Sequence, residues 1–266
     1  MKNFNITRYS QLLKLDFVQS RKNFMWGFVL MTLAYLAFFW FSHMSTQHYD
    51  MYPPYADYNR VAVINSNTAE MGMFCILIFF FAAASMLFLS EQRKQGRTAL
   101  LMLPATNLEK FLSRWTYLLV FSFVAGFLTF FLADLIHVVY LLGADMNVEW
   151  ASDDFLNCWP ATHNTRSWLQ TASIYGIWLF THAGFLLGSV LFKRFHFVAT
   201  AATMALLLVA YATVYNGTGL YQIRLSPDTS AILTLTVSLV GTAVCTGLAY
   251  WLFCRWQIVT HKFVNL

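Results

Sequence analysis

The sequence predicts an all-α membrane protein with six transmembrane helices, and three observations support this fold class. Hydrophobic residues make up 58% of the chain and charged residues only 11%, which leaves no room for a second soluble domain of ordinary size. Six apolar stretches of roughly 20 residues or more interrupt the polar segments, each long enough to cross a ~30 Å hydrocarbon layer. The charged residues lie almost entirely in the connecting segments, and basic and acidic residues are concentrated in different ones. The predicted spans are residues 24–44, 71–90, 115–142, 169–192, 197–216 and 230–254.

The distribution of basic residues predicts the orientation of the chain. Fourteen of the 17 lysines and arginines lie before the first span, between spans two and three or four and five, or after span six. Only Arg60, Arg166 and Arg224 fall in the other loops, which carry most of the acids. Because basic loops stay in the cytoplasm, both termini are expected there. Contact with anionic lipid accounts for the net charge of +5, so no nucleic-acid partner is expected.

Residues 5–22 are expected to form an amphipathic helix that lies in the membrane interface before the first span. Apolar residues recur at helical spacing, and basic residues occupy the opposite face, toward the lipid headgroups. The apolar face contains Ile6, Tyr9, Leu13 and Phe17, and the polar face contains Arg8, Gln11, Lys14 and Arg21. The span at 24–44 is too long for the core of a cleavable signal peptide, so we expect it to be retained.

The loop between spans two and three, residues 91–114, has the clearest local structure. Pro104 ends the short helix expected at 92–102, because the residue before a proline is driven out of helical geometry. Thr106 and Glu109 then match a capping box, in which each side chain bonds the other residue's amide. A new helix is therefore expected to begin near Asn107 and run into span three. The loop before span two, residues 45–69, contains Pro53 and Pro54, which break any continuous helix there.

Three ionisable residues fall inside predicted spans. Asp134 and His137 share a face of the third span, and His182 lies in the fourth. Ionisable groups in a membrane are costly and frequently functional, so a proton relay or a metal site is one interpretation. A satisfied structural pair, or contact with an aqueous cavity, is the favoured alternative.

Small residues in the later spans indicate surfaces where helices pack closely. Span four contains Gly176, Gly184 and Gly188, the last two in a GxxxG pattern. Glycine lets helix backbones approach each other in lipid, within one chain or between two chains. The acidic, tryptophan-containing loop at 143–168 is expected to form a small cap on the outer side.

The sequence lacks the motifs of the common hydrolases. It contains no GxxxxGK[ST] phosphate-binding loop, no HExxH and no GxSxG. Three of the four cysteines, Cys75, Cys245 and Cys254, lie in predicted spans, and no CxxC pair occurs. The chain is therefore not expected to be an enzyme, and no catalytic residue, cofactor site or metal site is assigned.

The segment LPATNLEKFLSR at residues 103–114, with the basic run at 93–97 before it, resembles a motif of bacterial ABC-2-type transporter permease subunits. The six-span layout is similar to that family as well. The resemblance implies one permease domain over 1–266 in the bacterial inner membrane. A separate cytoplasmic ATPase would bind ATP and Mg²⁺, and a second permease would complete a homodimer or heterodimer.

In that family the loop between spans two and three contains a coupling helix that docks on the ATPase. The residues that the resemblance assigns to coupling are Glu91, Gln92, Arg93, Lys94, Arg97, Pro104, Glu109 and Lys110. The expected function is thus the permease subunit of an ABC exporter. The alternative is a non-transporting immunity or sensor protein that binds a partner through its outer loops. A third interpretation, an intramembrane enzyme, requires Asp134, His137 and His182 to cluster.

Overall fold

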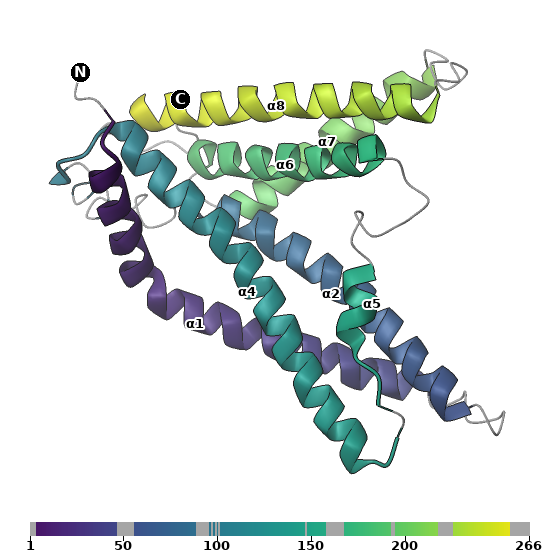
Figure 1. Ribbon diagram of the computed structural model, residues 1–266. Helices are drawn as coiled ribbons and strands as arrows, with labels where there is room; N and C mark the ends of the chain where they lie inside the picture. The colour runs from purple at the N-terminus through teal and green to yellow at the C-terminus, as the bar shows by residue number, and fades with distance from the viewer. Residues whose placement is uncertain are drawn as a thin grey trace. The chain divides into compact units, whose positions relative to one another are not determined.

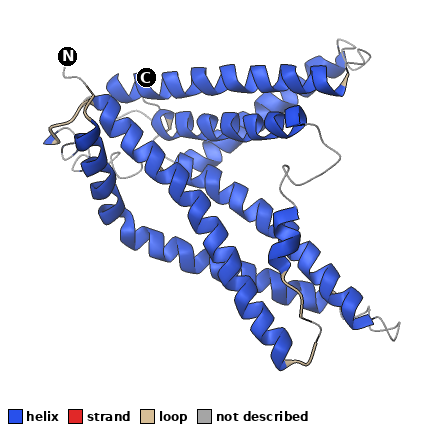
Figure 2. Cartoon of the chain, in the orientation of Figure 1, coloured by secondary structure: helices blue, strands red, loops and turns tan. Residues whose placement is uncertain are grey.

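The computed structural model describes residues 4–46, 56–88, 96, 98, 100, 102–146, 148–157, 168–192, 195–217 and 226–255. The secondary structure of these parts is α-helical (Figures 1 and 2). The helices are α1 (Ile6–Ser45), α2 (Ala56–Ser85), α4 (Asn107–Gly143), α5 (Ala151–Asn157), α6 (Trp168–Leu191), α7 (His196–Gly217) and α8 (Pro227–Arg255).

Five of these helices are long and apolar enough to cross a membrane. The corresponding segments are Phe24–Ser45, Val61–Ser85, Asn107–Gly143, Trp168–Leu191 and Pro227–Arg255. The fifth of the six predicted spans corresponds to α7, whose apolar part His196–Ala210 is shorter. The fold is therefore that of a multi-pass helical membrane protein with five such segments and one shorter apolar helix.

Two helices begin or continue where the sequence predicted a break. The predicted interfacial helix at 5–22 and the first span form a single helix, α1, of 40 residues. No proline or glycine lies between residues 6 and 26 to interrupt it. Helix α2 begins at Ala56, inside the predicted loop 45–69, and ends at Ser85 rather than residue 90. Its polar first turns, from Ala56 onward, contain no proline or glycine, so polarity alone misled the prediction.

The chain divides into two compact units. Unit 1 comprises Met1–Asp16, Phe80–Leu119 and Arg166–Leu266, and unit 2 comprises Phe17–Phe79 and Val120–Thr165. Each unit therefore combines segments that are distant in the sequence.

In unit 1, helix α6 packs against both α7 and α8 (Figure 1). The predicted packing glycines lie at these contacts. A side chain at Gly184 would overlap Met204 of α7, and one at Gly188 would overlap Thr200 of the same helix. Gly176 instead faces Ser238 of α8. These glycines therefore pack within the chain, where the missing side chain allows close approach of the helices.

In unit 2, aromatic side chains fill the space between α1, α4 and α5. Phe130 of α4 is fully buried and stacks on Phe155 of α5, with ring centroids 4.1 Å apart. Tyr35 of α1 meets Phe130 edge-on at 5.4 Å. Gly72 of α2 faces the Phe130 ring so closely that a Cβ there would lie 2.6 Å from it. The short helix α5 is thus part of the core of unit 2.

Candidate functional site

The corner that precedes α4, residues 103–106, has the capping geometry that the sequence predicted. The Thr106 amide donates to Glu109 Oε2 at 2.8 Å, and the Glu109 amide donates to Thr106 Oγ1 at 3.2 Å. Within the corner, the Ala105 amide donates to the Leu103 carbonyl at 2.8 Å. Because the capping bonds satisfy the amide of Thr106, which precedes the helix, and the Glu109 amide in its first turn, they fix the point where α4 begins.

Glu109 also binds the beginning of α1, a role that the sequence did not reveal. The Asn5 amide donates to Glu109 Oε1 at 2.7 Å, and Arg8 Nη2 donates to the same oxygen at 3.1 Å. The Glu109 side chain is fully buried. Its two oxygens therefore join the corner before α4 to the first turn of α1.

A second polar contact joins the same two helices farther along. Ser113 Oγ donates to Asp16 Oδ2 at 2.9 Å, and Arg114 Nε lies 3.6 Å from Asp16 Oδ1. We call the two contacts together the α1–α4 clamp, defined by Asn5, Arg8, Asp16, Glu109, Ser113 and Arg114. Both contacts lie within unit 1.

The clamp corrects the predicted role of Arg8. The sequence placed Arg8 on a basic face directed at lipid headgroups, but its guanidinium pairs with Glu109. Leu12 and Asp16, each one further turn along α1, are likewise buried. The face of α1 that meets α4 is therefore polar at both ends, whereas Ile6 and Phe17 of the predicted apolar face are exposed.

An aromatic cluster secures the start of α4 to the end of α8. Phe111 is almost fully buried, with Phe88 at 5.9 Å and Phe253 of α8 at 5.7 Å between ring centroids. Leu100, which precedes the corner, belongs to the same core. The residues on both sides of the corner thus pack on the end of α8 in unit 1.

The structure describes part of the predicted coupling segment. Gly96, Thr98, Leu100 and Met102 are helical, as expected for a short helix at 92–102. Glu91, Gln92, Arg93, Lys94 and Arg97 lie outside the described residues.

The other three predicted coupling residues differ in exposure. Pro104 is exposed. Glu109 and Lys110 are 0% and 5% exposed, so their side chains are covered within the chain. Glu109 therefore suits positioning the corner rather than touching a partner directly.

The carboxylate of Asp134 is bound to backbone amides at the start of α5. The Ala151 amide donates to Oδ1 at 3.1 Å, and the Ser152 amide donates to Oδ2 at 2.9 Å. Asn65 of α2 adds a bond from Nδ2 to the Glu149 carbonyl at 3.3 Å. With both oxygens engaged and no exposed surface, Asp134 holds the start of α5 in place within unit 2.

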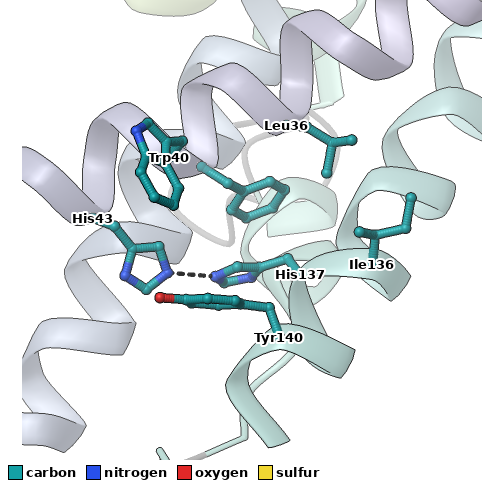
Figure 3. Close-up of a pocket in the computed structure, with 7 residues that line it drawn as sticks. Leu36, Trp40, His43, Ile136, His137 and Tyr140 are labelled. Atoms are coloured by element: carbon teal, nitrogen blue, oxygen red, sulfur yellow. Dashed lines mark hydrogen bonds between the residues drawn. The ribbon is translucent and has the colours of Figure 1, made fainter. Parts of the chain in front are cut away.

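His137 pairs with His43 of α1. Their Nε2 atoms lie 3.0 Å apart, and both side chains are buried (Figure 3). The sequence did not point to His43, because its only local signal was a histidine near the end of an apolar stretch. Phe39 of α1 stacks on the His137 ring at 4.1 Å, and the Tyr140 ring meets His43 edge-on at 5.3 Å.

His182 belongs to unit 1 and has different neighbours. Trp115 Nε1 donates to its Nε2 at 3.3 Å, and Phe80 stacks on the ring at 4.1 Å. Within the described parts of the chain, no group of three or more histidine, cysteine or acidic side chains is arranged to hold a metal ion. Each of the three predicted intramembrane residues thus has its own separate set of partners.

Comparison with protein families gave one informative match. Residues 12–162 match the model of the ABC-2 family transporter protein, which covers more than half of the 266-residue chain. Searches of curated proteins and of solved structures found no match. The matched region includes α1 from Leu12 onward, α2, the corner, α4 and α5. The chain therefore belongs to the ABC-2 family of ABC transporter membrane proteins.

Proposed function

We propose that this protein is the permease subunit of an ABC exporter in a bacterial inner membrane, driven by a separate cytoplasmic ATPase. The chain has no phosphate-binding loop of its own, so ATP and Mg²⁺ would be bound by that partner. Two permeases, identical or different, would enclose the translocation path. The substrate is assigned to no chemical class.

The α1–α4 clamp is the observation that carries this proposal. The predicted coupling residues directly precede a corner that Glu109 attaches to α1 by bonds of 2.7 and 3.1 Å. The aromatic cluster of Phe88, Phe111 and Phe253 attaches the same corner to α8. A displacement that reaches the corner would therefore pass to α1, α4 and α8 together.

The ATPase interaction can be tested by co-purification. The chain is expressed with the ATPase encoded nearest to it, and the complex is isolated through a tag on the ATPase. The triple variant Arg93→Glu, Lys94→Glu and Arg97→Glu should lose the complex, because reversed charges at a contact cost affinity. Charge reversal at Asp153 and Asp154, on the opposite predicted side, serves as the control.

The clamp predicts a different defect from that of the coupling loop. Glu109→Gln removes the negative charge that pairs with Arg8. It also leaves one side-chain oxygen to accept from donors that now bind two oxygens, namely Asn5 and Arg8 on Oε1 and Thr106 on Oε2. The variant should retain the ATPase but lose substrate-stimulated ATP hydrolysis. A triple variant that binds the ATPase normally would disprove the assignment of residues 91–97. Normal coupling in Glu109→Gln would disprove the role of the clamp.

A further inference from the structure

A cavity beside the histidine pair contains the second notable site of the chain. A pocket of about 200 Å³, open on one side, lies between α1 and α4 within unit 2. Its apolar wall contains Leu36, Phe39, Trp40 and Ile136, and its polar groups are His43, His137 and Tyr140 (Figure 3). The transport mechanism proposed above assigns no role to these residues.

We propose that His43 and His137 form a reversible two-nitrogen binding site for a late first-row divalent metal ion, with Cu²⁺ preferred. Neutral imidazole is the commonest metal ligand among protein side chains. The two Nε2 atoms face each other at 3.0 Å from different helices. The proposal concerns binding only and does not depend on transport or on an ATPase.

The 3.0 Å separation of the two nitrogens is that of the hydrogen bond between the rings, and it is also compatible with adjacent ligands of one metal ion. With metal–nitrogen bonds of about 2.0–2.1 Å, a 3.0 Å separation corresponds to an angle of about 91–97° at the metal. Adjacent ligands of a square-planar or tetragonal ion are about 90° apart, as Cu²⁺ and Ni²⁺ prefer. A tetrahedral ion such as Zn²⁺ would require the nitrogens to be about 3.3–3.4 Å apart.

The surroundings of the pair fix the rings and leave room for further ligands. Phe39 and Tyr140 pack on the two imidazoles, which limits their rotation. Asp134, one turn before His137, already accepts two amide hydrogen bonds, so the protein supplies two nitrogens. The adjoining cavity is large enough for water molecules that would complete the coordination.

Binding requires a proton shift within one ring and a small rotation of both rings, which turns the two Nε2 lone pairs from each other toward a common ion. In the metal-free pair, one Nε2–H donates to the other Nε2. On metal binding that proton moves to Nδ1 of the same ring, and both Nε2 lone pairs bind the ion. No net proton is released and the copper stays Cu²⁺. The bound ion then connects α1 to α4 at two strong bonds in place of one hydrogen bond.

Copper binding by the full chain tests the proposal. The protein is purified in detergent through a tag without histidine and titrated with Cu²⁺. One ion should bind, and its electron paramagnetic resonance spectrum should show coupling to two imidazole nitrogens. Saturation should raise the Tm by about 5 °C, since the ion binds only the folded pair.

Variants assign the nitrogens. His43→Gln and His137→Gln should each lower the Cu²⁺ affinity at least about tenfold, because a ligand is removed. His182→Gln is the matched control, since His182 is equally buried but lies in unit 1, and it should bind as the wild type does. Unchanged affinity in either pair variant overturns the proposal. If those variants fail to fold, a wild-type spectrum without two-nitrogen coupling overturns it.

Discussion

The substitution Asp134→Asn tests whether the Asp134 carboxylate anchors α5 or takes part in a proton relay. The side chain accepts one amide hydrogen bond on each oxygen, at 3.1 Å from Ala151 and 2.9 Å from Ser152. Asparagine keeps one acceptor oxygen and places an NH₂ group against the second amide. One buried N–H group then lacks an acceptor, which costs about 1–3 kcal/mol. Asp134→Ala removes both acceptors and should cost roughly twice as much.

The effect should appear first in α5. Because each 1.4 kcal/mol is a factor of ten, hydrogen exchange at Ala151 and Ser152 should accelerate by about 5- to 140-fold in Asp134→Asn. The Tm should fall by about 2–12 °C. Exposed Asp153, on the same short helix, supplies the control Asp153→Asn, which should change neither value. Transport should continue below the lowered Tm with an unchanged pH profile.

The opposite pattern would refute this reasoning. If Asp134→Asn abolishes transport while α5 exchange and the Tm stay at wild-type values, Asp134 acts in proton transfer rather than in attaching α5. If both exchange and transport are unchanged, the two amide bonds do not stabilise α5.

Two further substitutions test the packing of unit 1. Gly188→Leu should lower the free energy of unfolding by about 1–3 kcal/mol, because the leucine side chain would overlap Thr200. The control Gly247→Leu, at a position with nothing within 4 Å, should leave the Tm unchanged. Equal losses in both variants would contradict the α6–α7 contact. Phe111→Ala should cost about 3–5 kcal/mol through the cavity it leaves. The half-exposed Leu108 on the same helix gives the control Leu108→Ala, and a larger Tm loss there would disprove the aromatic cluster.

Local signals in the sequence predicted the helix start that matters most. Thr106 and Glu109 are three residues apart, so their capping bonds depend on the chain's own geometry and could be predicted together with the start of α4. Pro104 acts locally in the same way. The limits of α6 and α8 followed from long apolar runs without interruption. Two predicted helix limits, before α2 and between residues 22 and 24, rested on polar residues without a proline or glycine at the limit itself. Both limits were wrong, because polar residues alone do not end a helix.

The contacts that define the sites could not be predicted in this way. Glu109 meets Arg8 across 101 residues of sequence, and His43 meets His137 across 94. No periodicity within one helix reveals its partner on another. The capping box predicted the partner of Glu109 Oε2, which is the Thr106 amide. The partners of Oε1, Asn5 and Arg8, come from α1 and its preceding residue and depend on the packing of α1 against α4 in unit 1.

The central claim is that the segment before the corner touches an ATPase on the cytoplasmic side. The most direct measurement places a photo-crosslinking amino acid at position 97 or, as the control, at position 154, in cells that express the chain with its ATPase. The account predicts a covalent adduct between position 97 and the ATPase, identified by mass spectrometry, and none from position 154. An ATPase adduct from position 154, or its absence from position 97 in an assembled complex, would contradict it.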